Sequence, residues 1–121
     1  MSGAMHYDIA AVNGTRLYYE SRGNGAPILF ISGAFGDAGG WQRASEILAN
    51  RYTTISYDRR GNSRSTAPPG WTSTSLDEQA ADAAALIEHC RLGPAIVWAS
   101  SLGGGIALTS CSSNWNTGGQ P

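Results

Sequence analysis

The sequence predicts an α/β fold in which a β-hairpin is followed by the order β-α-β-α-β-α, with a mostly parallel sheet that stays incomplete. Three observations carry this prediction. Strand-like and helix-like segments alternate along most of the 121 residues. An Asn13-Gly14 pair separates two β-type runs near the start. An apolar run, a sharp turn and a helix-like segment follow one another over residues 95–108.

The first elements are two strands over residues 6–12 and 15–21. An Asn-Gly pair between such runs is typical of a two-residue hairpin turn, because both turn positions need a positive φ. The next turn is expected at residues 23–25. Residues 27–31 are continuously apolar, so we expect a strand that is buried on both faces of the sheet.

A helix and a strand come next. A glycine-rich loop over residues 33–40 precedes a segment with apolar residues at helical spacing, and the β-branched and aromatic residues 53–57 predict another strand. A polar loop then covers residues 58–70. The apolar residues of the predicted helix are Trp41, Ala44, Ile47 and Leu48.

The second helix begins with a capping box formed by Ser75 and Glu78. Gly93-Pro94 ends it, and the strand that starts at Ala95 follows. The residues expected on its inner face are Leu76, Ala80, Ala83, Ile87 and Cys90.

The turn after the Ala95 strand carries Ser101, which lies between Ala99 and Gly103 in a small-x-Ser-x-Gly pattern. A serine on a tight strand-to-helix turn needs small residues two positions before and after it, because larger side chains would collide with the neighbouring elements. Ser100 does not fit, since larger residues flank it. Ser101 is therefore the candidate nucleophile, and a glycine-rich turn with two idle serines is the alternative.

Two backbone groups are candidates for an oxyanion hole. The helix after the turn directs its free N–H groups at the serine, so the N–H of Leu102 faces a developing oxyanion. The loop after the 27–31 strand leaves the carboxyl end of that strand, where open parallel sheets bind ligands. The N–H of Ala34 is therefore the second candidate donor, and an ordinary connecting loop is the alternative.

Other polar residues are weaker candidates. Residues 58–65 combine an acid, several arginines and a glycine after a strand. Asp58 resembles a catalytic acid in this place, but an ion-paired turn is the favoured interpretation. His6 opens the first strand and His89 lies on the second helix, where a solvated side chain is the simplest expectation.

The composition argues against several classes of function and partner. The net charge is −1, and Arg59, Arg60 and Arg64 cluster without a basic stripe, so no nucleic-acid partner is expected. Cys90 and Cys111 show neither metal-ligand spacing nor a disulfide framework. No apolar run approaches the ~20 residues of a membrane span, and no secretory signal is visible. We therefore expect a cytoplasmic protein with a small-molecule substrate and no membrane partner.

Together these motifs resemble the α/β-hydrolase fold family, in the branch of small esterases, epoxide hydrolases, haloperoxidase-like enzymes and lactone hydrolases. The resemblance covers Tyr7 to about Leu108. Residues 31–35 resemble the His-Gly-x oxyanion motif, with Ser32 in place of the usual His. Residues 58–65 resemble Asp-x-Arg-Gly-x-Gly-x-Ser, with Ser63 in place of a Gly, and residues 99–103 resemble the nucleophile elbow.

The resemblance implies a serine hydrolase for an ester, lactone or related acyl substrate, which uses an acyl-enzyme and neither a metal nor an organic cofactor. It implies Ser101 as the nucleophile and Ala34 and Leu102 as the oxyanion hole. Lyases and cofactor-free haloperoxidases share the elbow, so the reaction type stays open. The catalytic acid and His of the family follow the elbow, but no Asp, Glu or His follows Ser101 here. The alternative is an inactive, non-catalytic remnant or pseudoenzyme fragment.

We expect residues 6–108 to form a partial domain that corresponds to the N-terminal part of this fold, truncated after the elbow. Residues 109–121 are rich in Ser, Asn and Gly, so we expect a disordered or out-of-frame tail. With GC-rich codons, one added nucleotide before Thr109 would turn the tail into an amphipathic continuation of the helix. The missing strands would leave the Ala95 strand with an open edge, through which the chain is expected to self-associate.

Overall fold

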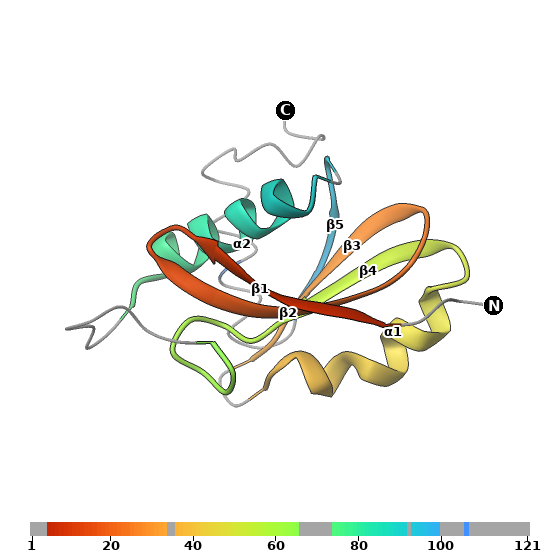
Figure 1. Ribbon diagram of the computed structural model, residues 1–121, viewed down its shortest axis with the longest axis horizontal. Coiled ribbons are helices and arrows are strands. Elements are labelled where there is room, and N and C mark those ends of the chain that lie inside the picture. Colours follow the sequence, from red (N-terminus) through yellow and green to blue (C-terminus); the bar gives the residue numbers. More distant parts are fainter. Residues whose placement is uncertain (1–4, 34–35, 66–73, 92, 100–105, 107–121) are drawn as a thin grey trace.

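The computed structural model describes residues 5–33, 36–65, 74–91, 93–99 and 106. These residues form a five-stranded sheet with helices on its two faces (Figure 1). In chain order the elements are β1 (His6–Val12), β2 (Thr15–Gly23), β3 (Ala26–Ile31), the 3₁₀ helix η1 (Ala38–Trp41), α1 (Gln42–Leu48), β4 (Tyr52–Tyr57), α2 (Leu76–Cys90) and β5 (Ile96–Ala99). The order agrees with the predicted alternation.

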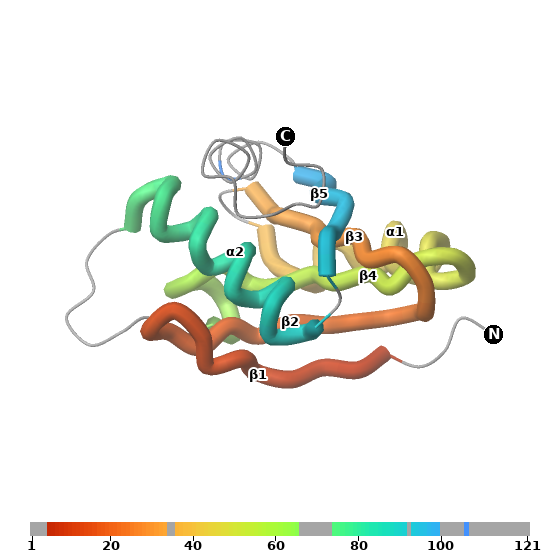
Figure 2. The backbone as a smooth tube through the Cα atoms, turned by 90° about the horizontal axis from the view of Figure 1, so that it is seen from above, coloured from red at the N-terminus to blue at the C-terminus, as the bar shows by residue number. Residues whose placement is uncertain are grey.

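The strand order across the sheet is β1-β2-β4-β3-β5. Strand β3 pairs in parallel with both β4 and β5, whereas β2 pairs in antiparallel fashion with both β1 and β4. The described sheet is therefore mixed: the hairpin continues a parallel part made of β3, β4 and β5. Figure 2 shows β5 beside β3 at one side of the sheet and β1 at the other.

The hairpin turn has the backbone that its sequence predicts. Asn13 and Gly14 have φ values of 50° and 75°, which is the positive-φ pair that a two-residue hairpin requires. The turn between β2 and β3 also depends on glycine. Gly25 has a φ of 141°, and a Cβ there would collide with the carbonyl group of Arg51. Only glycine allows β3 to begin this close to the segment that precedes β4.

Strand β3 is buried on both faces, as predicted. Leu29 and Ile31 contribute to a core under α2, whereas Phe30 lies on the opposite face and stacks on Trp41 with ring centroids 4.7 Å apart. Sheet faces alternate along a strand, so the two helices cover opposite faces. The buried members of the core under α2 are Ala10, Leu17, Tyr19, Leu29, Ile31, Ile55, Tyr57, Ala80, Ala83, Leu86, Ile87 and Ile106.

Helix α2 begins at the predicted cap, where the Ser75 hydroxyl accepts a hydrogen bond of 3.0 Å from the N–H of Glu78. The predicted inner face is wrong at Leu76, which is 41% exposed. Gln79, Asp82 and Leu86 are buried instead. Gln79 and Asp82 turn inward because their side chains accept hydrogen bonds from two arginines of the loop after β4. These hydrogen bonds set the rotation of the helix about its axis.

No helix in the described ranges is long and apolar enough to cross a membrane.

Helix α1 has the predicted position, but its Ile47 is 63% exposed. Its more buried residues are Ser45, which is fully buried, and the predicted Ala44 and Leu48, which are partly buried.

Candidate active site

Three parallel strands end in one row at the same edge of the sheet. Ile31 is the last residue of β3 and pairs with Ala99, the last residue of β5. On the other side of β3, Phe30 pairs with Ser56, so β4 ends at Tyr57 on the same level. The chain runs from β3 to β4 on one side and then to β5 on the other. Ligands of open α/β sheets bind at such a reversal, outside the carboxyl ends of the strands.

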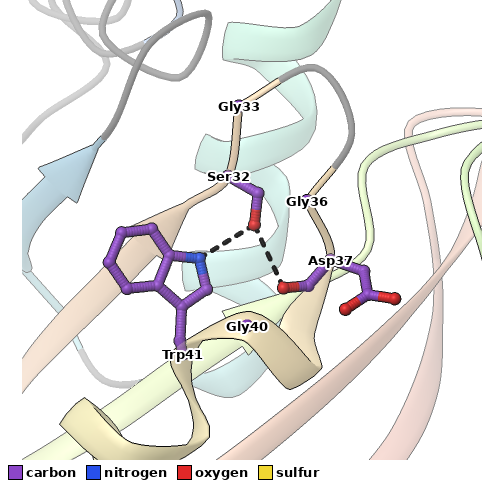
Figure 3. Close-up of a pocket in the computed structure, with 6 residues that line it drawn as sticks. All are labelled: Ser32, Gly33, Gly36, Asp37, Gly40 and Trp41. Carbon is purple, nitrogen blue, oxygen red and sulfur yellow. Dashed lines mark hydrogen bonds between the residues drawn. The ribbon is translucent and has the colours of Figure 1, made fainter.

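Ser32 fixes the loop that leaves β3. Its side chain is buried, and its Oγ accepts a hydrogen bond of 2.8 Å from Trp41 Nε1 and donates one of 3.2 Å to the carbonyl of Asp37 (Figure 3). The N–H of Gly36 bonds to the carbonyl of Gly33 at 3.1 Å. The serine that replaces the histidine of the family motif therefore joins the start of the loop to its end.

A pocket of about 200 Å³ lies against this loop. The stacked indole of Trp41 forms one wall, and glycines leave the backbone accessible on the others (Figure 3). The volume lined by these described residues is below the ~300–1,000 Å³ of typical sites for drug-sized ligands. Its lining residues are Ser32, Gly33, Gly36, Asp37, Gly40 and Trp41.

Asp58 forms an ion-paired turn, as the sequence predicts. Its fully buried carboxylate accepts a 2.8 Å hydrogen bond from the N–H of Ala38 and bonds of 2.9 Å from both the N–H and Nε of Arg64. The hydrogen bond to Asp58 raises the pKa of Arg64. Ser63, at the position of a family glycine, adopts a φ of 47°, and its hydroxyl donates to Asp37. Asp58 thus joins the loops after β3 and β4.

Arg60 is almost completely buried and pairs with α2. Its Nε and NH2 donate to the two carboxylate oxygens of Asp82, both at 2.8 Å, and its NH1 lies 3.1 Å from Glu78. It also donates to the carbonyl of Asn13 at 3.0 Å. The bond to Asp82 raises the pKa of Arg60. Through Asp82 and Asn13, Arg60 connects the loop after β4 to α2 and to the hairpin turn.

Arg59 points toward the loop after β3. Its NH2 donates a 3.0 Å hydrogen bond to the carbonyl of Gly33, and its NH1 donates a 2.8 Å bond to Oε1 of Gln79 on α2. Burial lowers the pKa of the guanidinium below its ordinary value. The loop after β3 is therefore held at Gly33 by Arg59, at Ser32 by Trp41, and at Ala38 by Asp58.

The family model for the alpha/beta hydrolase fold matches residues 26–114. The chain belongs to the alpha/beta hydrolase family. It is 37% identical over 100 residues to the uncharacterized hydrolase YraK of Bacillus subtilis, a match that covers 83% of this chain and 37% of YraK. It is also 37% identical over 98 residues to a non-heme haloperoxidase of Rhodococcus erythropolis, covering 80% of this chain and 35% of the relative.

Solved structures agree on the fold. The epoxide hydrolase VrEH1 of Vigna radiata superposes with a TM-score of 0.86 at 22% identity, over 93% of this chain and 36% of that one. This alpha/beta hydrolase chain thus spans little more than a third of the length of the relatives that it matches.

The three predicted site residues of this alpha/beta hydrolase, namely Ser101, Ala34 and Leu102, lie outside the described residues. The strand ends that precede them are described, and they are neighbours. The histidines lie elsewhere: His6 and His89 are exposed and contact Tyr19 on β2, with ring centroids 6.3 Å and 6.0 Å away. In the sheet, β4 and β3 lie between β2 and β5.

Neither Cys90 nor Cys111 was expected to belong to a metal site or a disulfide. Cys111 lies outside the described residues. Cys90 is a free, partly buried thiol. Burial raises its pKa to about 11, so it stays protonated at neutral pH, as an idle thiol does.

Sequence reasoning did not find the bonds from Arg59 to Gly33 and from Trp41 to Ser32. The segments that they join are distant in the chain, and nothing in the local pattern of either segment indicates the other. One signal was present. A serine at the histidine position of the oxyanion motif requires another way to fix the loop, and a nearby indole N–H supplies it.

The bond between Trp41 and Ser32 can be tested by Trp41→Phe, which keeps a ring on Phe30 but removes the indole N–H. We expect the free energy of unfolding, measured by urea denaturation, to fall by about 1 kcal/mol, which is the usual net value of one hydrogen bond. Trp98 also contacts Phe30 but is 55% exposed, so Trp98→Phe should cost less than about 0.5 kcal/mol. Equal losses in the two variants would contradict the role of the bond.

Proposed function

We propose that the protein carrying this sequence is a serine hydrolase that acts on an ester, lactone or related acyl substrate through an acyl-enzyme. In this proposal Ser101 is the nucleophile, and the backbone N–H groups of Ala34 and Leu102 stabilise the oxyanion. The relatives support this reaction class, because they include a hydrolase and a haloperoxidase of the same family.

One observation carries the proposal: Ile31 and Ala99 are paired at the ends of adjacent parallel strands. Ala34 comes three residues after the first and Ser101 two residues after the second. The two segments that would supply the donor and the nucleophile therefore begin side by side at one sheet edge. The loop after β3 is also fixed by hydrogen bonds at both of its ends, as a preorganised oxyanion site requires.

We further propose that these 121 residues hold the nucleophile and the oxyanion donors, but not the general base. No Asp, Glu or His follows Ser101, and Asp58 is committed to Ala38 and Arg64. The position of both histidines near Tyr19 favours a second candidate function, in which the chain is a non-catalytic remnant.

A fluorophosphonate probe, which reacts with activated serines, distinguishes these functions. We expect the protein carrying this sequence to be labelled on the peptide that contains Ser101. Ser101→Ala should abolish the label, because it removes the attacking oxygen. Ser100→Ala is the matched control and should keep it. Labelling that persists in Ser101→Ala would contradict the assignment, and a protein that is never labelled would support the remnant.

A further inference from the structure

Strand β1 is the outermost described strand on the side of the sheet opposite β5 (Figure 2). The N–H of Ile9 donates a 2.8 Å hydrogen bond to the side chain of Asp8. Its partner residue on β2 is Tyr18, whose N–H bonds to the hydroxyl of Ser65 and not to β1. The backbone groups of Ile9 therefore point away from β2. Because this direction alternates along an antiparallel strand, Tyr7 also directs its N–H and C=O outward.

The side chains at this edge are exposed on both faces of the sheet. On one face, Met5, Tyr7 and Ile9 are 38%, 63% and 42% exposed. His6 and Asp8 alternate with them, so they lie on the opposite face, and both are exposed. Among the described residues, β1 pairs only with β2. A strand with outward backbone groups and an exposed apolar row is a template for pairing with another strand.

A second copy of β1 fits this edge in one register. When two identical strands pair in antiparallel fashion about a two-fold axis, residue i faces residue j and j faces i. A slip by one residue would move the side chains to the wrong face, so the axis passes through a residue. An axis at His6 or Asp8 would place two identical polar side chains opposite each other, and an axis further along the strand gives Asp8 no polar partner. An axis at Tyr7 places His6 opposite Asp8 of the second copy.

In the register centred on Tyr7 the opposing side chains are complementary on both faces. His6 and Asp8 form the non-hydrogen-bonded kind of pair, in which side chains lie closer, and the symmetry produces this pair twice. An imidazole donates an N–H to a carboxylate whether or not it is charged. On the other face, Met5 lies opposite Ile9 and the two Tyr7 side chains meet. The Ile9 N–H exchanges Asp8 for a carbonyl of the second strand, which frees the carboxylate for His6.

We propose that β1 is a dimerisation edge, at which two copies of this protein join by antiparallel pairing centred on Tyr7. The complementarity of His6 and Asp8 identifies a second copy as the occupant, because the strand supplies both members of the pair. The described part of the paired segment runs only from Met5 to Ile9, so the interface is small and the dimer is weak and reversible. This inference does not depend on the proposed activity.

Charge exchange tests the register in the protein that carries this sequence. His6→Asp places two carboxylates opposite each other, and Asp8→Lys removes the acceptor that faces His6. By sedimentation velocity, we expect each variant to dimerise about tenfold more weakly than the unsubstituted protein, because cross-strand pairs of like charge are unfavourable and two pairs are affected. Asp77→Lys makes the same change of charge at an exposed position of α2 and is the matched control, which should leave dimerisation unchanged.

Mixing the two weakened variants gives a sharper result. In a mixed dimer the new aspartate faces the new lysine, and the unchanged Asp8 of one copy faces the unchanged His6 of the other. Both pairs are then complementary, so native mass spectrometry should show mixed dimers in excess over random exchange. The double variant His6→Asp with Asp8→Lys contains complementary pairs in one chain and should dimerise as the unsubstituted protein does.

Three results would overturn the proposal. The first is an unsubstituted protein that stays monomeric up to millimolar concentration. The second is dimerisation that is equally strong in all variants, because association through β5 or another surface does not depend on residues 6 and 8. The third is a double variant as weak as the single variants. Should circular dichroism show that one single variant does not fold, the double variant is compared with the other one, and recovery of the dimer supports the proposal.

Discussion

Replacing Asp82 with asparagine is expected to lower the free energy of unfolding by about 3 kcal/mol, the lower end of the cost of breaking a buried ion pair. Among the described residues, the buried guanidinium of Arg60 then keeps only the partly exposed carboxylate of Glu78 as a charged partner. Asp82 holds Arg60 through two bonds of 2.8 Å and accepts a third, of 2.7 Å, from the side chain of Asn13. An asparagine would turn its NH2 group toward the arginine and offer one acceptor in place of two. Whole domains are stable by only about 5–15 kcal/mol, so the loss is large.

Urea denaturation followed by circular dichroism measures this loss. The matched control is Asp77→Asn, an exposed carboxylate in the first turn of the same helix, which should cost less than about 1 kcal/mol. The double variant Arg60→Met with Asp82→Leu should recover most of the stability, because an apolar pair of similar volume often replaces a buried ion pair without net cost. A loss below about 1 kcal/mol in Asp82→Asn would show that the pair is not the main connection between α2 and the loop after β4.

Local patterns allowed the elements to be predicted, since the chemistry of each lies within a few neighbouring residues. The Asn13-Gly14 turn follows from the cost of a positive φ, and the start of α2 follows from the orphan N–H groups that Ser75 satisfies. The burial of β3 on both faces follows from its unbroken apolar run. The antiparallel pairing of β2 with β4 was not predicted, because no local pattern determines which distant strands pair.

The inner face of α2 shows where local reasoning failed. An apolar stripe at helical spacing includes Leu76, but the helix turns Gln79 and Asp82 inward. Each of these polar residues is buried because it has a partner, Arg59 or Arg60, in a loop about 20 residues earlier in the chain. Buried polar groups need such partners, and their pairing depends on the tertiary fold.

The candidate site was predictable in outline. The motifs indicated two strand ends, and the structure places these ends side by side, with Ile31 paired to Ala99. The roles of Ser101, Ala34 and Leu102 stay predictions, since these residues lie outside the described part of the chain. What the motifs did not give is how the loop after β3 is held, which depends on Ser32, Trp41 and Arg59.

The second large effect concerns β5. Among the described residues it is the outermost strand on its side of the sheet, and it pairs only with β3. Its Ile96 and Trp98 are 53% and 55% exposed. An apolar edge strand with free backbone groups is a template for pairing with another chain.

We therefore expect the 121-residue chain to self-associate through β5, or to fold poorly, when it is produced alone. Size-exclusion chromatography at several concentrations should show assemblies larger than a monomer. Ile96→Lys should shift them toward the monomer, because charges on an edge strand repel between copies. Ile47→Lys is the matched control: Ile47 is 63% exposed on α1, away from this edge, and its replacement should leave the assembly unchanged. A compact monomer with a cooperative thermal transition at every concentration would show that the described edge needs no partner.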